Sequence, residues 1–271
     1  MENHRSLLAP RLAAKSAPSR VSILLKQGLA GSAALLSILA CSAPTAAADP
    51  LVLTDVRWIA EPAGGKKSAP RIRIQHRKSS SDQSFDGSRP YFAGAEAALG
   101  RRAPGPVSFS ITHDAGTLTC SGTLTGAFDG KGACRFTSDP AFERELSERG
   151  LAPDQRSSLL AMLLVDASIE LADGLAREGV RPKDADDLIA AAALDVRPEY
   201  VRDLKSEALV LTDVDDAIAC KALGVDGAYV RGLAAAGYRK LSADEVVGMK
   251  AMGVTGEYAR AMNRAAGGTT K

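Results

Sequence analysis

The chain reads DGAYVRGLAAAGY over residues 226–238 and TGEYARAMNRAAG over residues 255–267, so one helix-like phrase recurs after twenty-nine residues. The same spacing extends back to residue 139 and defines two apolar columns four residues apart, which places both columns on one face of a helix. The pattern predicts helical repeats of 29 residues over 139–266, with these columns as the repeat core. The first column holds Phe142, Leu171, Tyr200, Tyr229 and Tyr258, and the second holds Leu146, Leu175, Leu204, Leu233 and Met262.

The starts and ends of the first helix in each repeat are marked by residue type. Three residues before the aromatic column stand Asp139, Ser168, Arg197, Asp226 and Thr255. Four of these five side chains can accept a hydrogen bond from a free amide of the first turn, as N-cap residues do. Gly150, Gly179 and Gly237 each precede an apolar residue, as expected of a left-handed C-terminal cap.

A second short helix is predicted after each of these glycines. Ser242 and Glu245 have the spacing of a capping box. The apolar column of this second helix is predicted to be Leu160, Ile189, Ile218 and Val247. Helices this short are unstable alone, since about 12 to 15 residues are needed in water, so each must pack on its neighbours. Stacked helix pairs form a solenoid-like array, which usually presents a binding surface, although a merely stabilising array is the alternative.

Residues 49–138 show the alternation of a half-buried antiparallel sheet. Val107, Phe109 and Ile111 fall on one face of a strand, with polar residues between them. The stretch RKSSSDQSFDGSRP over 77–90 is polar and rich in Ser, Gly and Pro, so we expect an exposed loop there. The fold class expected is therefore α+β, with an N-terminal antiparallel β domain over 49–138, helical repeats over 139–266 and a disordered tail over 267–271.

Two cysteines of the predicted sheet, Cys120 and Cys134, are candidates for a disulfide. An oxidising compartment would favour the bond, and the alternation puts each cysteine on an apolar face. A two-residue turn at Asp129-Gly130 argues against it, because that turn would pair Cys120 with Asp139. A wider loop or a bulge would restore the register. Cys220 stands in an apolar column of the repeats and is expected to be a small buried residue.

The first 48 residues have the features of an export signal. Five basic residues lead into the apolar stretch GLAGSAALLSILA, and AAADP offers cleavage between Ala48 and Asp49. The expected location is therefore periplasmic or secreted. Two alternatives remain: ILAC ending at Cys41 resembles a bacterial lipobox, which would give a membrane-anchored lipoprotein, and an uncleaved segment would act as an anchor.

Composition excludes several protein classes. The chain has 271 residues with 45% apolar content and a formal charge of +2, values typical of a globular protein. Met1 to Ala48 holds five bases and one acid, so the remainder carries 29 bases and 31 acids. A general nucleic-acid-binding protein would be more basic, and no nucleic-acid partner is expected.

Residues able to carry chemistry are few. Beyond the predicted signal, His76 and His113 are the only histidines, and both are expected at strand ends. His113 beside Asp114 could be part of a metal or base site, but the sequence places no metal-ligand spacing around it, so a partly exposed turn histidine is expected. Six acids fall at helix starts, where they favour the helix dipole, rather than in a calcium loop: Asp184, Asp186, Asp187, Asp213, Asp215 and Asp216. No catalytic, metal or cofactor site is predicted.

The text GVDGAYVRGL, followed by LSADEVVGMKAMGVTGEYAR, resembles the poorly characterised helical repeats often written GVTPEYV and LSADELI. These occur in exported bacterial proteins and after the membrane part of some BlaR-type antirepressor metallopeptidases. DAGTLTCSG and CRFTSDPAF are similar to the β region that commonly precedes such repeats, and the resemblance covers roughly residues 107–266. It implies an envelope sensor or interaction domain. The chain lacks the HExxH motif of the peptidases.

The sequence therefore predicts an exported, non-enzymatic envelope protein that acts as a protein-interaction or sensory module through its helical repeats. The expected partner is another envelope protein, with membrane association only if the signal is retained or Cys41 is lipidated. A structural lipoprotein acylated at Cys41 and a hydrolase with an unrecognised site are the alternative hypotheses.

Overall fold

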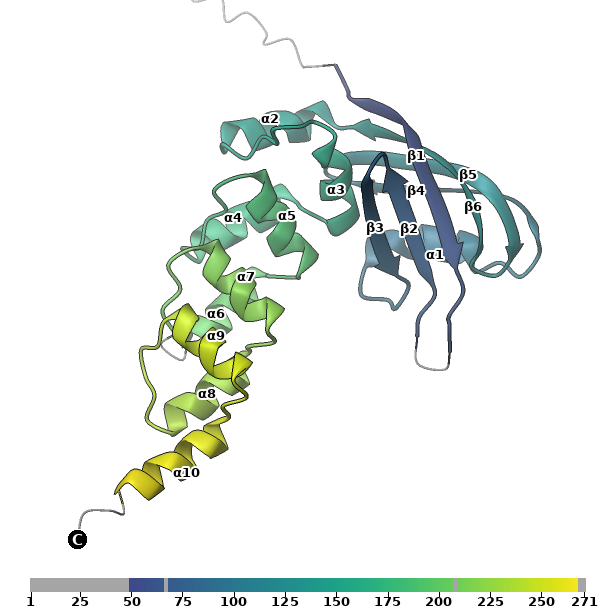
Figure 1. The fold of residues 1–271 in the computed structure, drawn as a ribbon. Helices are drawn as coiled ribbons and strands as arrows, with labels where there is room; N and C mark the ends of the chain where they lie inside the picture. Colours follow the sequence, from purple (N-terminus) through teal and green to yellow (C-terminus); the bar gives the residue numbers. More distant parts are fainter. Residues whose placement is uncertain (1–48, 66–67, 207–208, 268–271) are drawn as a thin grey trace, which may run out of the picture. The chain divides into compact units, whose positions relative to one another are not determined.

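A computed structural model of the protein describes residues 49–65, 68–206 and 209–267, and the mixed α+β fold class predicted from the sequence is confirmed. Strands precede residue 139 and helices follow it (Figure 1). The predicted signal over 1–48, with Cys41 and Ala48, lies outside the described residues, as do residues 268–271 of the predicted tail. Gly267, which the prediction also assigned to the tail, is the last residue of the final helix.

Six strands form one antiparallel sheet in the order β3-β2-β1-β6-β5-β4. A short 3-10 helix, η1 (Pro90–Phe92), and helix α1 (Ala93–Leu99) are inserted between β3 and β4 and contact β4. The strands are β1 (Val52–Glu61), β2 (Arg71–His76), β3 (Ser79–Ser84), β4 (Gly105–His113), β5 (Gly116–Gly126) and β6 (Asp129–Ser138).

The sheet core is built around Trp58 in β1, which is completely buried. Its ring stacks edge-on against Phe109 with centroids 5.4 Å apart, and its indole N–H donates to the carbonyl of Ser121 at 3.1 Å. Gly122 and Gly132 make room for it, because a Cβ at either position would come within 2.6 Å of the Trp58 side chain. The predicted face of Val107, Phe109 and Ile111 is buried, as the alternation requires.

The polar stretch 77–90 is not wholly a loop, so that prediction was wrong for its first part. Residues Ser79 to Ser84 form β3, which pairs with β2 along its whole length. The reversal occurs at Arg77, whose φ is 53°, and Arg73 and Asp82 form an ion pair at 2.9 Å across the two strands. Backbone pairing with β2 outweighs the weak strand preference of serine and aspartate, a common override in sheets.

The disulfide between Cys120 and Cys134 is present, with the two residues directly opposite each other in β5 and β6. The predicted turn at Asp129-Gly130 was wrong, because the chain reverses at residues 127–128, where Phe128 has a φ of 56°. The Phe128 amide donates to the carbonyl of Leu99 at 2.7 Å, and its ring packs at 5.4 Å from Phe85. Tertiary packing thus holds an aromatic residue in a conformation that local preference assigns to Asp-Gly.

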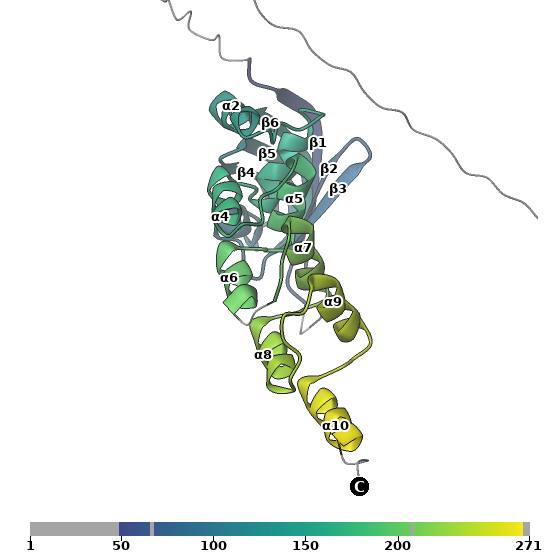
Figure 2. The same ribbon diagram turned by 90° about the vertical axis from the view of Figure 1, so that its left-hand side faces the viewer.

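Within the described residues, nine helices follow the sheet, and each helix from α2 to α8 contacts the helix two places further along the chain. The even-numbered helices α4, α6 and α8 lie on one side and the odd-numbered helices α5, α7 and α9 on the other (Figure 2). The helices are α2 (Pro140–Glu148), α3 (Ser158–Val165), α4 (Ile169–Arg177), α5 (Ala185–Ala193), α6 (Pro198–Ser206), α7 (Val214–Ala222), α8 (Gly227–Ala235), α9 (Ala243–Ala251) and α10 (Gly256–Gly267).

The predicted helix caps are confirmed. The side chains of Asp139, Ser168, Asp226 and Thr255 each accept a first-turn amide, and Ser242 with Glu245 forms a complete capping box. Positive φ angles occur at the predicted glycines, 72° for Gly150, 76° for Gly179 and 96° for Gly237. In the second helices, Leu160 is buried but Ile189, Ile218 and Val247 are only partly buried. The fully buried column lies one residue earlier, at Leu159, Leu188, Ala217 and Val246.

The predicted repeat core is buried except at its end. Phe142, Leu171, Leu146, Leu175, Leu204 and Leu233 are buried, and Tyr200 and Tyr229 are half-buried against the core. Tyr258 is 55% exposed and Met262 is 52% exposed, so the prediction that they belong to the core was wrong. Both lie on α10, where the described residues provide no following helix to cover them. Cys220 is a free, completely buried cysteine, as predicted, and burial raises the pKa of its thiol to about 11.

Among the described helices, none combines the length and the hydropathy needed to cross a membrane.

Candidate functional site

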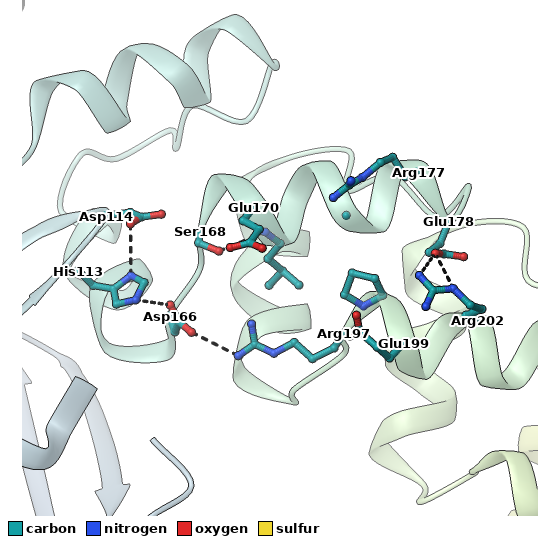
Figure 3. A pocket seen from close by; sticks show the side chains of 13 residues that line it. His113, Asp114, Asp166, Ser168, Glu170, Arg177, Glu178, Arg197, Glu199 and Arg202 are labelled. Atoms are coloured by element: carbon teal, nitrogen blue, oxygen red, sulfur yellow. Dashed lines mark hydrogen bonds and ion pairs between the residues drawn. The ribbon is translucent and has the colours of Figure 1, made fainter. Parts of the chain in front are cut away.

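A cleft with a volume of about 710 Å³ is lined mainly by polar and charged side chains. Its lining comes from the turn between β4 and β5, from the loop between α3 and α4, and from helices α4 and α6 (Figure 3). The cleft therefore combines the sheet with two successive repeats. Its charged and polar lining residues are His113, Asp114, Asp166, Ser168, Glu170, Arg177, Glu178, Arg197, Glu199 and Arg202.

His113 lies between two carboxylates at one end of the cleft (Figure 3). Its Nε2 atom is 2.9 Å from Oδ1 of Asp166, and its Nδ1 atom is 3.7 Å from Oδ1 of Asp114. The first contact does not have the geometry of a hydrogen bond, since Oδ1 of Asp166 has no hydrogen-bond partner among the described residues.

His113 is the last residue of β4 and is partly exposed beside the turn, as predicted, but its contact with Asp166 was not predicted. Its side chain is 27% exposed, and the decisive carboxylate, Asp166, belongs to the end of α3 and not to the neighbouring sequence. Asp166 has a φ of 62° at the C-cap of α3, a left-handed conformation that aspartate tolerates better than most residues.

Asp166 also joins the site to the next repeat. Its Oδ2 atom is 3.3 Å from a guanidinium nitrogen of Arg197, which in turn forms an ion pair with Asp195 at 2.8 Å. Asp166 therefore contacts a cation from the loop before α6 and the imidazole at the end of β4. One carboxylate thus connects the sheet and two repeats.

A second connection lies beside the first. The hydroxyl of Tyr91, between β3 and β4, donates to the carbonyl of Leu164 at 3.1 Å, and a guanidinium nitrogen of Arg89 lies 2.9 Å from that hydroxyl. The Tyr91 ring lies 5.3 Å from the His113 ring. Burial raises the pKa of Tyr91 above its ordinary value, so the hydroxyl stays protonated and acts as the donor.

The other walls of the cleft are helices α4 and α6, which approach each other closely at Gly174. A Cβ on Gly174 would come within 2.6 Å of the Pro198 ring, so only glycine permits this contact. Glu178 of the α4 terminus forms an ion pair with Arg202 of α6 at 2.5 Å. Glu170 and Glu199, in the first turns of the two helices, form no ion pair within the described residues.

The cleft does not have the arrangement of a Ser-His-Asp hydrolase. Ser168 lines it, but its hydroxyl accepts the Leu171 amide at 3.1 Å as a helix cap, and the residue is only 8% exposed. Both imidazole nitrogens of His113 face carboxylates, so neither is directed at a serine as a general base must be. The geometry supports binding of charged groups by pairing.

The remaining candidates from the sequence lie elsewhere. His76 is buried at the end of β2, with Nε2 3.0 Å from Oδ1 of Asp55. Asp184 and Asp213 are N-cap residues of α5 and α7, and Asp187 and Asp216 donate their amides to them, as the helix-start interpretation predicts. Within the described residues, no group of three or more His, Cys, Asp or Glu side chains is placed to hold a metal ion.

Sequence reasoning did not identify Asp166 and Arg197 as partners. One signal was present, because Arg197 is the single residue of the N-cap column that cannot accept a hydrogen bond. A cation at a helix start, opposed by the helix dipole, indicates a compensating carboxylate elsewhere. That carboxylate belongs to Asp166, 31 residues before Arg197, and only the fold brings the two side chains together.

Comparison of the chain with protein-family models, with curated proteins and with solved structures finds no match.

Proposed function

We propose that the protein is an exported, non-enzymatic interaction module that binds an extended, charged segment of another envelope protein in the cleft between the sheet and helices α4 and α6. The observation that carries this proposal is the cleft itself, which is large and has a polar lining built from successive repeats. A solenoid-like stacking of the helix pairs, also proposed here, would extend the binding surface along the array. The resemblance to exported repeat proteins remains a prediction that agrees with this role.

The chemistry of the cleft favours a partner segment that carries basic groups. Glu170 and Glu199 are carboxylates without ion pairs in the described residues. Of the three arginines that line the cleft, Arg197 and Arg202 are already neutralised by Asp166 and Glu178, and Arg177 donates to a backbone carbonyl of its own helix. A lysine or arginine entering the cleft would therefore meet two available acids. Such rim charges contribute specificity and association rate more than affinity.

Photo-crosslinking tests the proposal in the full chain in its own cells. A photoreactive residue at Glu199 is expected to capture one defined envelope protein, whereas the same residue at Asp186, an exposed first-turn acid of α5 outside the cleft, is expected to capture none. The double variant Glu170→Gln, Glu199→Gln should weaken that capture, and the matched double variant Asp186→Asn, Asp244→Asn should leave it unchanged. Equal capture from both positions would contradict the cleft as the binding site.

Export is tested separately by the intact mass of the protein recovered from cells. A mature protein that begins at Asp49 supports the free exported form. A lipid-modified Cys41 would instead identify the lipoprotein, and a retained Met1 would identify a tethered protein.

A further inference from the structure

The half-buried tyrosines of the repeats make one contact that recurs between units. The hydroxyl of Tyr200 in α6 donates to the carbonyl of Val225 at 2.8 Å, and the hydroxyl of Tyr229 in α8 donates to the carbonyl of Val254 at 2.7 Å. In both cases the acceptor lies 25 residues further along the chain. Val225 is in the loop between α7 and α8, and Val254 is in the loop between α9 and α10. Each inner tyrosine thus bonds to the unit that covers it.

A cation accompanies each of these tyrosines. Lys221 lies over the Tyr200 ring at 4.6 Å, and Lys250 lies over the Tyr229 ring at 4.4 Å. A cation over an aromatic face is attracted by the ring quadrupole. The surface that covers a tyrosine in this array therefore supplies both apolar contact and positive charge.

Tyr258 stands at the corresponding place in α10 without such a cover in the described residues. With Met262 one turn later, it forms an exposed apolar face on α10, next to Ala259, which is buried against the array. At about 100° per residue, Ala261 lies in this face, and Glu257 and Arg264 border it together on one flank. The acid is in the first turn of α10 and the base is in the last.

We propose that this face is a homodimerisation surface, on which α10 of a second copy of this chain packs antiparallel and centred near Ala261. A twofold axis between antiparallel helices brings the same flank of each copy together in reversed order. Glu257 of one copy then faces Arg264 of the other, and the same arginine lies near the Tyr258 ring, the place that lysine takes in the inner repeats. The face is complementary to itself in charge only in this antiparallel order.

The contact area of one 12-residue helix is small, so the dimer is expected to be weak and concentration dependent. Crosslinking in the full chain detects such a dimer. Ala261→Cys, at the centre of the proposed contact, is expected to give a disulfide-linked species of twice the chain mass after mild thiol oxidation. The matched control is Leu223→Cys, an exposed apolar position at the end of α7, which should give none above the parent chain.

Charge reversal tests the antiparallel order. In the Ala261→Cys background, Glu257→Arg alone and Arg264→Glu alone should each reduce the crosslinked fraction several-fold, and the two changes together should restore it. These side chains are exposed, so an unchanged thermal unfolding midpoint confirms that folding is intact. The proposal is overturned if Ala261→Cys crosslinks no better than Leu223→Cys, or if the double reversal fails to restore the dimer. Capture of a different protein at Ala261→Cys in place of the dimer would also overturn it.

Discussion

The sheet and the helical array are stabilised by contacts of different sequence range. The Leu51 amide donates to the Ser138 hydroxyl across 87 residues, and the Trp58 indole reaches Ser121 across 63. In the array, the tyrosine hydroxyls reach 25 residues and the ion pair of Arg149 with Asp173 reaches 24. Contacts in the sheet therefore depend on the whole β region, whereas contacts in the array depend on adjacent units.

This difference predicts how far the effect of a destabilising substitution spreads through the structure. When each unit contacts chiefly the next, the stability is approximately the sum of the stabilities of the units and of the interfaces between neighbours. A destabilising substitution can then affect only the units around it. A sheet whose central strands β1 and β6 are far apart in sequence has no such subdivision. Substitutions in the two regions test this contrast.

Trp58→Ala is expected to cost about 3 to 5 kcal/mol of unfolding free energy, because it removes the largest buried side chain of the sheet and its neighbours Gly122 and Gly132 cannot fill the space. Hydrogen exchange of the backbone amides, measured for each strand in denaturant, should show reduced protection across all six strands. Arg57→Ala, at the neighbouring exposed position, is the control and should cost little. Loss confined to β1 would contradict the cooperative sheet.

Leu233→Ala is expected to cost about 2 to 5 kcal/mol, since Leu233 is completely buried in α8. The effect should be local: hydrogen exchange should accelerate in α8 to α10 and leave the sheet protected. Leu223→Ala, a position 43% exposed, serves as the matched leucine control. Equal acceleration in the sheet would show that the array and the sheet unfold as one unit.

Tyr229→Phe is expected to cost about 0.5 to 1.5 kcal/mol, because it removes one hydrogen bond and leaves the carbonyl of Val254 without that donor. Tyr258→Phe removes the same hydroxyl from the exposed end of the array and should change the unfolding midpoint of dilute protein very little. The comparison isolates the hydrogen bond between units, since the two tyrosines occupy the same column of the repeat. Equal losses would mean that the Tyr229 bond adds nothing.

Glu143→Gln should have the smallest effect at neutral pH, since glutamine retains an acceptor. Burial would raise the pKa of Glu143, but hydrogen bonds from Arg156 and Ser138 overcome this and hold it below the ordinary value of 4.5. The stabilisation is therefore present above pH 4.5 and is lost as pH falls through the lowered pKa of the folded state.

Thermal unfolding of parent and Glu143→Gln as a function of pH checks this sign. The parent should be the more stable protein at neutral pH, and the difference should vanish below the lowered pKa. Because Glu143 connects α2 to Ser138 at the end of β6, the loss should fall at the junction of the two regions. A difference that persists in strong acid would contradict the ion pair.

Several features of the fold could be predicted because they depend on short-range chemistry. The caps at Asp139, Ser168, Asp226 and Thr255 need only a side-chain oxygen and an amide two or three residues away. The disulfide was suggested by compartment and alternation, but its register was not, because Phe128 forms the turn through packing on Phe85 and α1. The strand β3 was missed for the same reason: its pairing partner, rather than its composition, makes it a strand.

Local patterns of residues were enough to predict the 29-residue period, the helix boundaries, the alternating faces of the strands and the four leucines buried at the centre of the repeats. The helix boundaries and strand faces depend on backbone geometry that repeats within a few residues, and the period and the buried leucines follow from the recurrence of these local patterns along the chain. The contacts of Asp166 with both His113 and Arg197, and the exposure of Tyr258 where Tyr229 is covered, depend on how the chain folds and could not be predicted from local patterns. Identical residue types in one column acquire different roles because burial and pairing are set by neighbours far along the chain.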